Sequence, residues 1–179
     1  FSEIIYSITF KIISGTPIAR YGPIAHFGRF LKSYAKSDFV EIEGRKMFVG
    51  DDDIFALSIN KIWEPNETSI VKKNVNAGDI VLDIGANIGY YTLLLAQLVG
   101  PNGKVYAFEP DPKIFELLEK NVAINNYKNV ILIQKAVSNT NAKTKLFLSQ
   151  DRAQNRIFDS PNDGMSNNIE VETITLDQF

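Results

Sequence analysis

Asp83-Ile84-Gly85-Ala86-Asn87-Ile88-Gly89 is the stretch that decides the fold of this chain. It follows the apolar run Ile80-Val81-Leu82 and precedes Tyr90-Tyr91-Thr92-Leu93-Leu94-Leu95-Ala96. A short apolar strand that enters a glycine-rich loop and then a helix places backbone amides at a helix N-terminus, where a carboxylate or phosphate can bind. We therefore expect bare amides in this loop and a nucleotide-type cofactor beside them.

The spacing of the glycines separates two kinds of cofactor. Dinucleotide-binding folds favour G-x-G-x-x-G, because the second glycine lets a pyrophosphate lie against the backbone. Asn87 occupies that position here, and the pattern from Asp83 to Gly89 is Asp-x-Gly-x-x-x-Gly. This pattern favours S-adenosylmethionine over NAD, with an NAD-dependent oxidoreductase as the alternative.

A second apolar stretch, Lys104-Val105-Tyr106-Ala107-Phe108, ends in the carboxylate Glu109 and is followed by Pro110. An acid at the end of the second strand can accept hydrogen bonds from both ribose hydroxyls. Dinucleotide-binding folds also use an acid there, so Glu109 alone does not discriminate between the two cofactors.

The elements that follow are regular. Asp111 is expected to cap a helix with Pro112 in its first turn. The apolar face of this helix would consist of Ile114, Leu117, Leu118, Val122 and Ile124. Residues 129–134 are typical of a third strand, which Ala136-Val137-Ser138 would close. The alternation of strands and helices predicts right-handed crossovers and a parallel sheet in an α/β fold.

From Gly78 to Ser138 the chain resembles the FkbM-type family of class I S-adenosylmethionine-dependent methyltransferases. The likeness is carried by the ordered set 81–92, 105–112, Asn121, Asn125, Asn129-Val130 and 136–138. It implies a Rossmann-like class I methyltransferase sheet that is incomplete here. Relatives continue beyond the position of Phe179 into an apolar strand with a Lys-Ile-Asp-x-Glu-Gly type motif and the rest of the sheet.

The same resemblance implies roles in cofactor binding. The glycine loop would lie under the methionine part, Asp83 near its ammonium group, Glu109 on the ribose and Ala136 beside the adenine. The full implied cofactor-binding set is Asp83, Gly85, Ala86, Asn87, Gly89, Tyr90, Thr92, Glu109, Pro110 and Ala136. It includes no metal ligand, and no catalytic residue or general base can be named.

The resemblance further implies methyl transfer to an oxygen nucleophile by in-line displacement. The acceptor would be a hydroxyl on a sugar, glycolipid or polyketide-type metabolite. Such chemistry depends mainly on alignment of acceptor and methyl group in a dry pocket. A non-catalytic cofactor-binding fragment is a further alternative.

Composition suggests one globular domain with an appendage. The chain has 179 residues, of which 45% are hydrophobic and 22% charged. Nineteen basic and 21 acidic side chains give a net charge of -2, which offers no field for a polyanion, so we expect no nucleic-acid partner. The absence of cysteine excludes disulfides and thiolate metal sites.

The apolar stretches are too short for a membrane span, and no signal pattern is present, so we expect a cytoplasmic protein. The sequence begins at Phe1 without an initiator methionine, which suggests that it starts inside a longer one.

The first 64 residues are predicted to form the appendage, and residues 65–179 the cofactor-binding domain. Two amphipathic helices are expected in the appendage, one with the face Ile4, Ile5, Ile8 and Ile12, the other with Ile24, Phe27, Leu31 and Tyr34. The only histidine, His26, lies on the second. Residues 39–49 alternate around Glu43-Gly44 and predict a β-hairpin. Asp51-Asp52-Asp53 is expected to cap a helix from Ile54 to Ile62 in preference to binding a metal.

Beyond the third strand, residues 144–149 and 169–176 alternate like half-buried strands and are predicted to pair antiparallel. Residues 151–168 between them form a polar loop. The first parallel strand, Ile80 to Ile84, would be left with one unpaired edge, which predicts self-association. Glu64 and Glu67 precede that strand and could reach the cofactor.

Overall fold

The structure is a computed structural model that describes residues 39–50, 53, 55–149, 155–157 and 167–179. All of these except Phe39 belong to one compact unit, Val40–Phe179. The two amphipathic helices predicted near the N-terminus, with His26, lie outside the described residues, as do Asp51 and Asp52.

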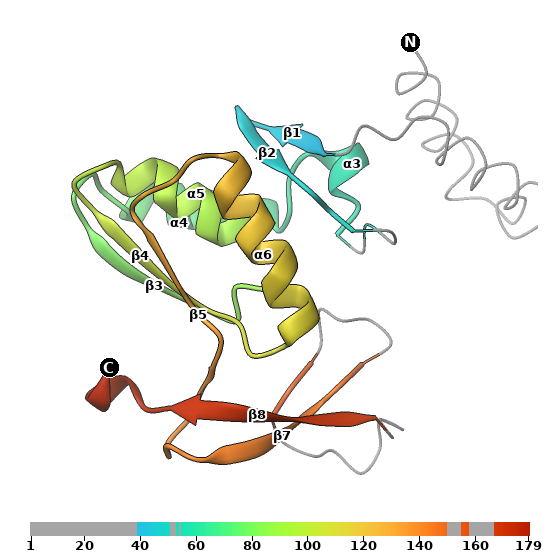
Figure 1. Cartoon of the computed structure of the whole chain (residues 1–179). Helices are drawn as coiled ribbons and strands as arrows, with labels where there is room; N and C mark the ends of the chain where they lie inside the picture. The colour runs from blue at the N-terminus through green and yellow to red at the C-terminus, as the bar shows by residue number, and fades with distance from the viewer. Residues whose placement is uncertain (1–38, 51–52, 54, 150–154, 158–166) are drawn as a thin grey trace, which may run out of the picture. The chain divides into compact units, whose positions relative to one another are not determined.

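A parallel sheet of three strands forms the centre of the unit (Figure 1). Its strands are β3 (Ile80–Ile84), β4 (Lys104–Phe108) and β5 (Val130–Ile133), in the order β3-β4-β5. Helix α5 (Tyr90–Val99) connects the first pair, and α6 (Pro112–Ile124) connects the second. The predicted Rossmann-like arrangement is therefore confirmed, and the carboxyl ends of β3 and β4 lie next to each other.

Helices cover one face of this sheet. Leu93 of α5 and Leu118 of α6 are buried in one apolar cluster with Ala107 of β4. On the opposite face of β3, Ile80, Leu82 and Ile84 are 69%, 44% and 53% exposed. In the part of the chain that the structure describes, β3 pairs only with β4. Self-association through this edge stays a prediction.

Helix α6 begins as its sequence predicts. The Asp111 carboxylate accepts hydrogen bonds from the backbone N–H groups of Lys113 and Ile114, at 2.9 and 3.4 Å. Pro112 follows in the first turn, where its missing N–H costs nothing. Asp111 therefore fixes where the helix starts, directly after the end of β4.

The predicted hairpin is present as β1 (Val40–Ile42) and β2 (Arg45–Met47), paired antiparallel. Its turn residues Glu43 and Gly44 both have positive φ, 50° and 80°, which matches the twist that two-residue hairpin turns require. Ile42 and Met47 are buried in the same cluster as Leu93 and Leu118. The hairpin thus shares its core with the helices that cover the parallel sheet, and the predicted boundary between residues 64 and 65 stays a prediction.

The helix predicted from Ile54 to Ile62 is shorter, because α3 covers only Leu57–Asn60. Ala56 and Lys61, on either side of it, have positive φ and end the helix. Asp53 does act as a cap: its carboxylate accepts from the N–H groups of Leu57 and Ser58 at 2.9 and 3.0 Å. The sequence interpretation omits α4 (Pro65–Asn74), although Pro65 at its first turn is a helix-start signal.

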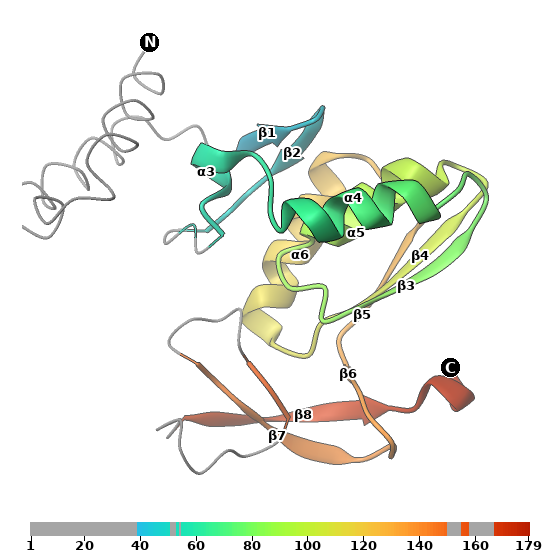
Figure 2. The ribbon, with the colours of Figure 1, turned by 180° about the vertical axis from the view of Figure 1, so that it is seen from behind.

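A second sheet contains β6 (Ala136–Val137), β7 (Lys143–Phe147) and β8 (Asn168–Ile174), in the order β6-β8-β7 (Figure 2). The antiparallel pairing of β7 with β8 is confirmed. The expectation that residues 136–138 close the third parallel strand is wrong. The Lys135 N–H donates to the Ile133 carbonyl at 2.9 Å, and this tight turn ends β5, so that Ala136 pairs with Thr173 of β8 instead.

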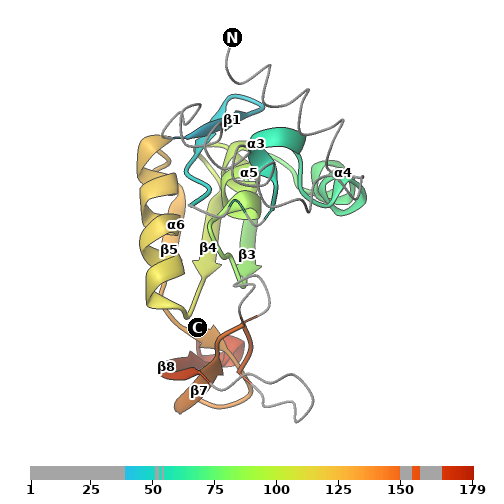
Figure 3. The ribbon, with the colours of Figure 1, turned by 90° about the vertical axis from the view of Figure 1, so that its right-hand side faces the viewer.

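The second sheet lies beyond the carboxyl ends of β3 and β4 (Figure 3). Among the described residues, no helix is long and apolar enough to cross a membrane. Of the polar loop predicted over residues 151–168, the structure describes residues 155–157, 167 and 168, and Asn168 already belongs to β8. There Arg156 and Phe147 exchange backbone hydrogen bonds of 3.2 and 2.8 Å.

Candidate cofactor site

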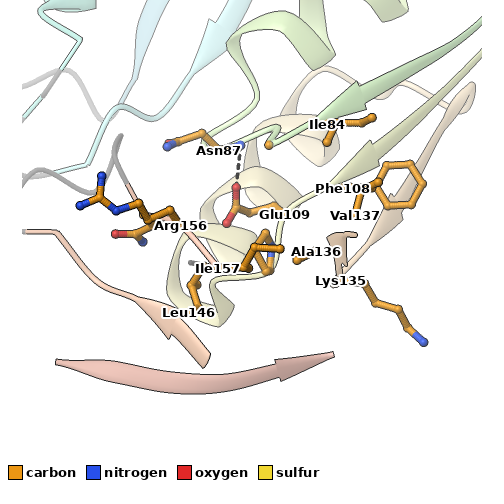
Figure 4. Close-up of a pocket in the computed structure, with 13 residues that line it drawn as sticks. Ile84, Asn87, Phe108, Glu109, Lys135, Ala136, Val137, Leu146, Arg156 and Ile157 are labelled. Carbon is orange, nitrogen blue, oxygen red and sulfur yellow. Dashed lines mark hydrogen bonds between the residues drawn. The ribbon is translucent and has the colours of Figure 1, made fainter. Parts of the chain in front are cut away.

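A cavity of about 280 Å³ lies between the ends of β3 and β4 and the second sheet. Its size is at the lower edge of the roughly 300–1,000 Å³ that small-molecule sites occupy. Its lining comes from the glycine loop, the end of β4, β6, β7 and residues 155–157: Ile84, Gly85, Asn87, Phe108, Glu109, Pro110, Lys135, Ala136, Val137, Leu146, Asn155, Arg156 and Ile157. Figure 4 shows Asn87 and Glu109 on one side of it, and Leu146 and Ile157 on the other.

The glycine loop turns tightly because its backbone is left-handed at alternate positions. Gly85, Asn87 and Gly89 have φ values of 80°, 50° and 95°. The positive φ of Gly89 favours glycine, and a Cβ there would lie 2.7 Å from Leu118 Cδ1 and displace that side chain. Asn87 tolerates the left-handed conformation, and its Oδ1 accepts a hydrogen bond from the Ile88 N–H at 2.7 Å.

The expectation of bare amides in this loop is wrong. Gly85 and Ala86 both donate their N–H to the Phe108 carbonyl, each at 2.9 Å. The Asn87 N–H donates to Glu109 at 2.9 Å, and the Gly89 N–H to the Ala86 carbonyl at 2.9 Å. Phe108 and Glu109, at the end of the neighbouring strand, therefore accept most of the loop's N–H hydrogen bonds. An anionic ligand would have to compete with these acceptors for the same N–H groups.

Glu109 is the buried charge of the cavity, with 5% of its surface exposed. One carboxylate oxygen accepts from the Asn87 N–H and the other from the Asp111 N–H, both at 2.9 Å. Burial raises the pKa of Glu109 to about 7, against the effect of these two hydrogen bonds, and the charges of Asp111 and Asp83 add to the rise. Each oxygen keeps a further lone pair, so Glu109 can accept hydrogen bonds from ligand hydroxyls.

Asp83 has a different environment. Its carboxylate accepts a hydrogen bond from the Thr92 hydroxyl at 2.5 Å, and Thr92 is fully buried in the first turn of α5. Burial raises the pKa of Asp83, against the effect of the hydrogen bonds from Thr92. Neither residue is among those that line the cavity. The Asp83 carboxylate therefore holds the start of α5.

The structure divides the predicted site residues into two groups. Those that line the cavity together are Gly85, Asn87, Glu109, Pro110 and Ala136. Those that do not line it are Asp83, Ala86, Gly89, Tyr90 and Thr92. In the second group, the Tyr90 hydroxyl contacts the Thr68 hydroxyl at 3.2 Å and its ring lies under the Arg45 guanidinium, 6.0 Å from the centroid. The role of each residue toward a cofactor stays a prediction.

Several lining residues could not be predicted from the sequence, because they come from the second sheet and from residues 155–157 beside it. Asn155 joins this wall to α6: its Nδ2 donates to Asp111 at 3.0 Å, and its Oδ1 accepts from the Ser149 N–H at 2.9 Å. No local periodicity marks this contact. Glu64, in contrast, accepts from the Tyr91 hydroxyl at 2.9 Å, and neither it nor Glu67 lines the cavity.

Comparison with known proteins gives one family. Residues 83–179, more than half of the chain, match the model described as the methyltransferase FkbM domain. The match begins at Asp83 and covers the glycine loop, Glu109 and the second sheet. It therefore includes every residue that lines the cavity.

Individual relatives match over shorter stretches. A protein-L-isoaspartate O-methyltransferase of Aeropyrum pernix is 44% identical over 54 residues, which are 30% of this chain and 21% of that protein. A solved S-adenosylmethionine-dependent O-methyltransferase of Thermotoga maritima superposes with a TM-score of 0.40 at 24% identity, over 59% of this chain and 44% of that one. The chain spans about a fifth to a third of the length of the curated relatives it matches.

One relative corrects an expectation drawn from charge. A tRNA(Phe) (4-demethylwyosine(37)-C(7)) aminocarboxypropyltransferase of Methanocaldococcus jannaschii is 34% identical over 84 residues, 45% of this chain and 33% of that protein. The exclusion of nucleic acid as a partner is therefore wrong. A net charge of -2 describes this stretch as a whole and does not exclude a nucleic-acid substrate for a protein built on the same unit.

Proposed function

The chain belongs to the FkbM methyltransferase family, and on that premise we propose that the protein is an S-adenosylmethionine-dependent methyltransferase whose cofactor binds in the cavity at the ends of β3 and β4. The observation that carries the proposal is the buried Glu109 carboxylate, which lines this cavity opposite an apolar wall. A ligand that combines hydroxyl groups with an apolar part would suit this lining. Adenosine has both.

The residues present fit such a ligand. Glu109 would hold the ribose hydroxyls, since each of its oxygens has a free lone pair beyond its backbone hydrogen bond. Ala136, Val137 and Ile157 would supply apolar surface for the adenine. When bound, the cofactor supplies a methyl group activated by its sulfonium. The chain's own part is to bind and orient the ligand and to exclude water from it.

The acceptor that we propose is a hydroxyl on a sugar, glycolipid or polyketide-type metabolite, in keeping with the family resemblance. The acceptor oxygen would form the new bond to carbon as the bond from that carbon to sulfur breaks, and the hydroxyl proton would leave to a base or to water. A cytoplasmic location remains part of the same proposal. Alignment within the cavity, rather than covalent catalysis, would be the main contribution of the protein.

Parallel isothermal titrations with S-adenosylhomocysteine and NADH test the cofactor. We expect binding of S-adenosylhomocysteine and none of NADH, because Asn87 brings a side chain to the position where a dinucleotide fold has a bare glycine. Binding of NADH alone would reverse the assignment and favour an oxidoreductase.

The acceptor is tested separately, with radiolabelled S-adenosylmethionine and a panel of glycans, polyketide-type alcohols, isoaspartyl peptides and tRNA. Incorporation of label into a metabolite hydroxyl is the expected result. Label in peptide or tRNA would replace the proposed acceptor and keep the methyltransferase. Cofactor binding without transfer to any acceptor would favour the non-catalytic alternative.

A further inference from the structure

Asn121 of α6 and Asn125, the residue that follows the helix, pair with the edge of the β1–β2 hairpin as a neighbouring strand would. The Asn125 Oδ1 accepts from the Lys46 N–H at 2.9 Å, and its Nδ2 donates to the Lys46 carbonyl at 2.6 Å. The Asn121 Oδ1 accepts from the Phe48 N–H at 2.6 Å, and its Nδ2 donates to the Phe48 carbonyl at 3.0 Å. Lys46 and Phe48 thus each have a donor and an acceptor for their backbone groups, as they would beside a second strand.

The two asparagines differ in what the second hydrogen of each amide does. In Asn125 it is donated to the Asn121 carbonyl, at 2.7 Å, in the last turn of α6. In Asn121 it is donated to the Ile88 carbonyl, at 2.7 Å, in the glycine loop. Asn121 is fully buried, whereas Asn125 is partly exposed. Only Asn121 therefore joins the hairpin, α6 and the loop in one hydrogen-bonded unit.

A hydrogen bond to the Ile88 carbonyl can fix the orientation of the glycine loop. Ile88 follows Asn87, which lines the cavity and donates its N–H to Glu109, and precedes Gly89, the N-cap of α5. A hydrogen bond to this carbonyl restrains the peptide plane between Ile88 and Gly89. Because Gly89 lies against Leu118 of α6, the loop has two attachments to the helix that carries Asn121.

We propose that Asn121 is a positioning residue for the cofactor loop and couples that loop to the docking of the β1–β2 hairpin. This inference rests on the proposed function, in which the loop and Glu109 bind S-adenosylmethionine. It assigns a role to Asn121 that its contact with the hairpin alone would not require. It also makes the hairpin, which does not line the cavity, a determinant of cofactor affinity.

The test compares Asn121→Ala with Asn125→Ala in the 179-residue chain. Both changes remove a bidentate contact to the hairpin, and only the first releases the loop. We expect the dissociation constant for S-adenosylhomocysteine, measured by isothermal titration, to rise about tenfold in Asn121→Ala and less than about twofold in Asn125→Ala. Wild-type affinity in a folded Asn121→Ala chain would overturn the coupling, whatever its melting temperature.

A hairpin variant keeps the inference testable if Asn121→Ala does not fold. Gly44→Val strains the turn at a residue with φ of 80°, where an added Cβ meets nothing within 4 Å. We expect it to weaken S-adenosylhomocysteine binding about two- to threefold and to speed amide exchange at Gly89. An unchanged affinity in a chain with a loosened hairpin would contradict the coupling. Failure of the wild-type chain to bind would instead reject the proposed function, and this inference with it.

Discussion

Asp83 and Glu109 are acids at the ends of neighbouring parallel strands, and they do different things. Both are buried, with 9% and 5% of their surface exposed. Asp83 lies within β3 and accepts from Thr92 of the covering helix, whereas Glu109 lies one residue beyond β4 and lines the cavity. Within β3 the alternation of the pleat sends the Asp83 side chain toward the helix layer, whereas Glu109, one residue beyond β4, is free of the pleat and faces the cavity.

The largest difference between the two acids is expected in cofactor affinity, which should depend on Glu109 much more than on Asp83. Glu109→Gln removes the charge and one of the two acceptor oxygens, so we expect S-adenosylhomocysteine affinity to fall about 100-fold, as for the loss of hydrogen bonds to a charged group. Asp83→Asn makes the same chemical change away from the cavity and should alter affinity less than about threefold. Isothermal titration measures both. Similar losses in the two variants would show that the carboxylates share one role.

Protein stability should depend more on Asp83 than on Glu109, the reverse of the order expected for cofactor affinity. Asp83→Ala leaves the buried Thr92 hydroxyl without its hydrogen-bond acceptor. It should therefore lower the free energy of unfolding, measured by urea titration, by about 1–3 kcal/mol. Asp83→Asn keeps an acceptor for Thr92 and should stay within about 1 kcal/mol of wild type. A double variant with Thr92→Val provides the control, since removal of both partners should cost less than the sum of the single changes. Strict additivity would mean that the two side chains do not interact.

The pH dependence sharpens the comparison for Glu109. Its pKa is raised by burial from 4.5 to about 7, so the stability that the protonated form contributes is present in full below about pH 4.5 and is lost as the pH rises through about 7. Glu109→Gln should lack this decline between pH 4.5 and 7. Cofactor affinity should change in the opposite sense in wild type, rising through about pH 7 as the carboxylate ionises and can accept from both hydroxyls. Parallel pH profiles in the two proteins would show that another group titrates.

The smallest effect is expected next to Asp83 on the uncovered face of β3. Leu82 is 44% exposed, so Leu82→Ala should cost less than about 1 kcal/mol of unfolding free energy. Its neighbour Asp83, buried against α5, is the internal reference. A loss from Leu82→Ala as large as that from Asp83→Ala would indicate that both faces of the strand are covered in solution.

Local sequence signals predict much of this fold. The apolar run before Asp83 and the capping pair Asp111-Pro112 each depend on residues close together in the chain, and their elements form as expected. The capping of Leu57 by Asp53 follows the same logic, although left-handed residues at both ends shorten α3.

What the sequence could not predict depends on distant partners. The loop amides bond to Phe108 and Glu109 of the next strand, and Ala136 pairs with Thr173, 37 residues further along the chain. Neither pairing produces a periodic pattern of apolar residues in the sequence. Asn121 and Asn125 are marked by the family resemblance, but only the fold shows that they pair with the hairpin edge.

A crystal structure of the chain with S-adenosylhomocysteine tests the central claim most directly. The account predicts the ribose hydroxyls within hydrogen-bond distance of the Glu109 carboxylate, and the adenine against Ala136 and Val137 in the cavity of about 280 Å³. A ligand bound elsewhere, with Glu109 still bonded only to the N–H groups of Asn87 and Asp111, would contradict it.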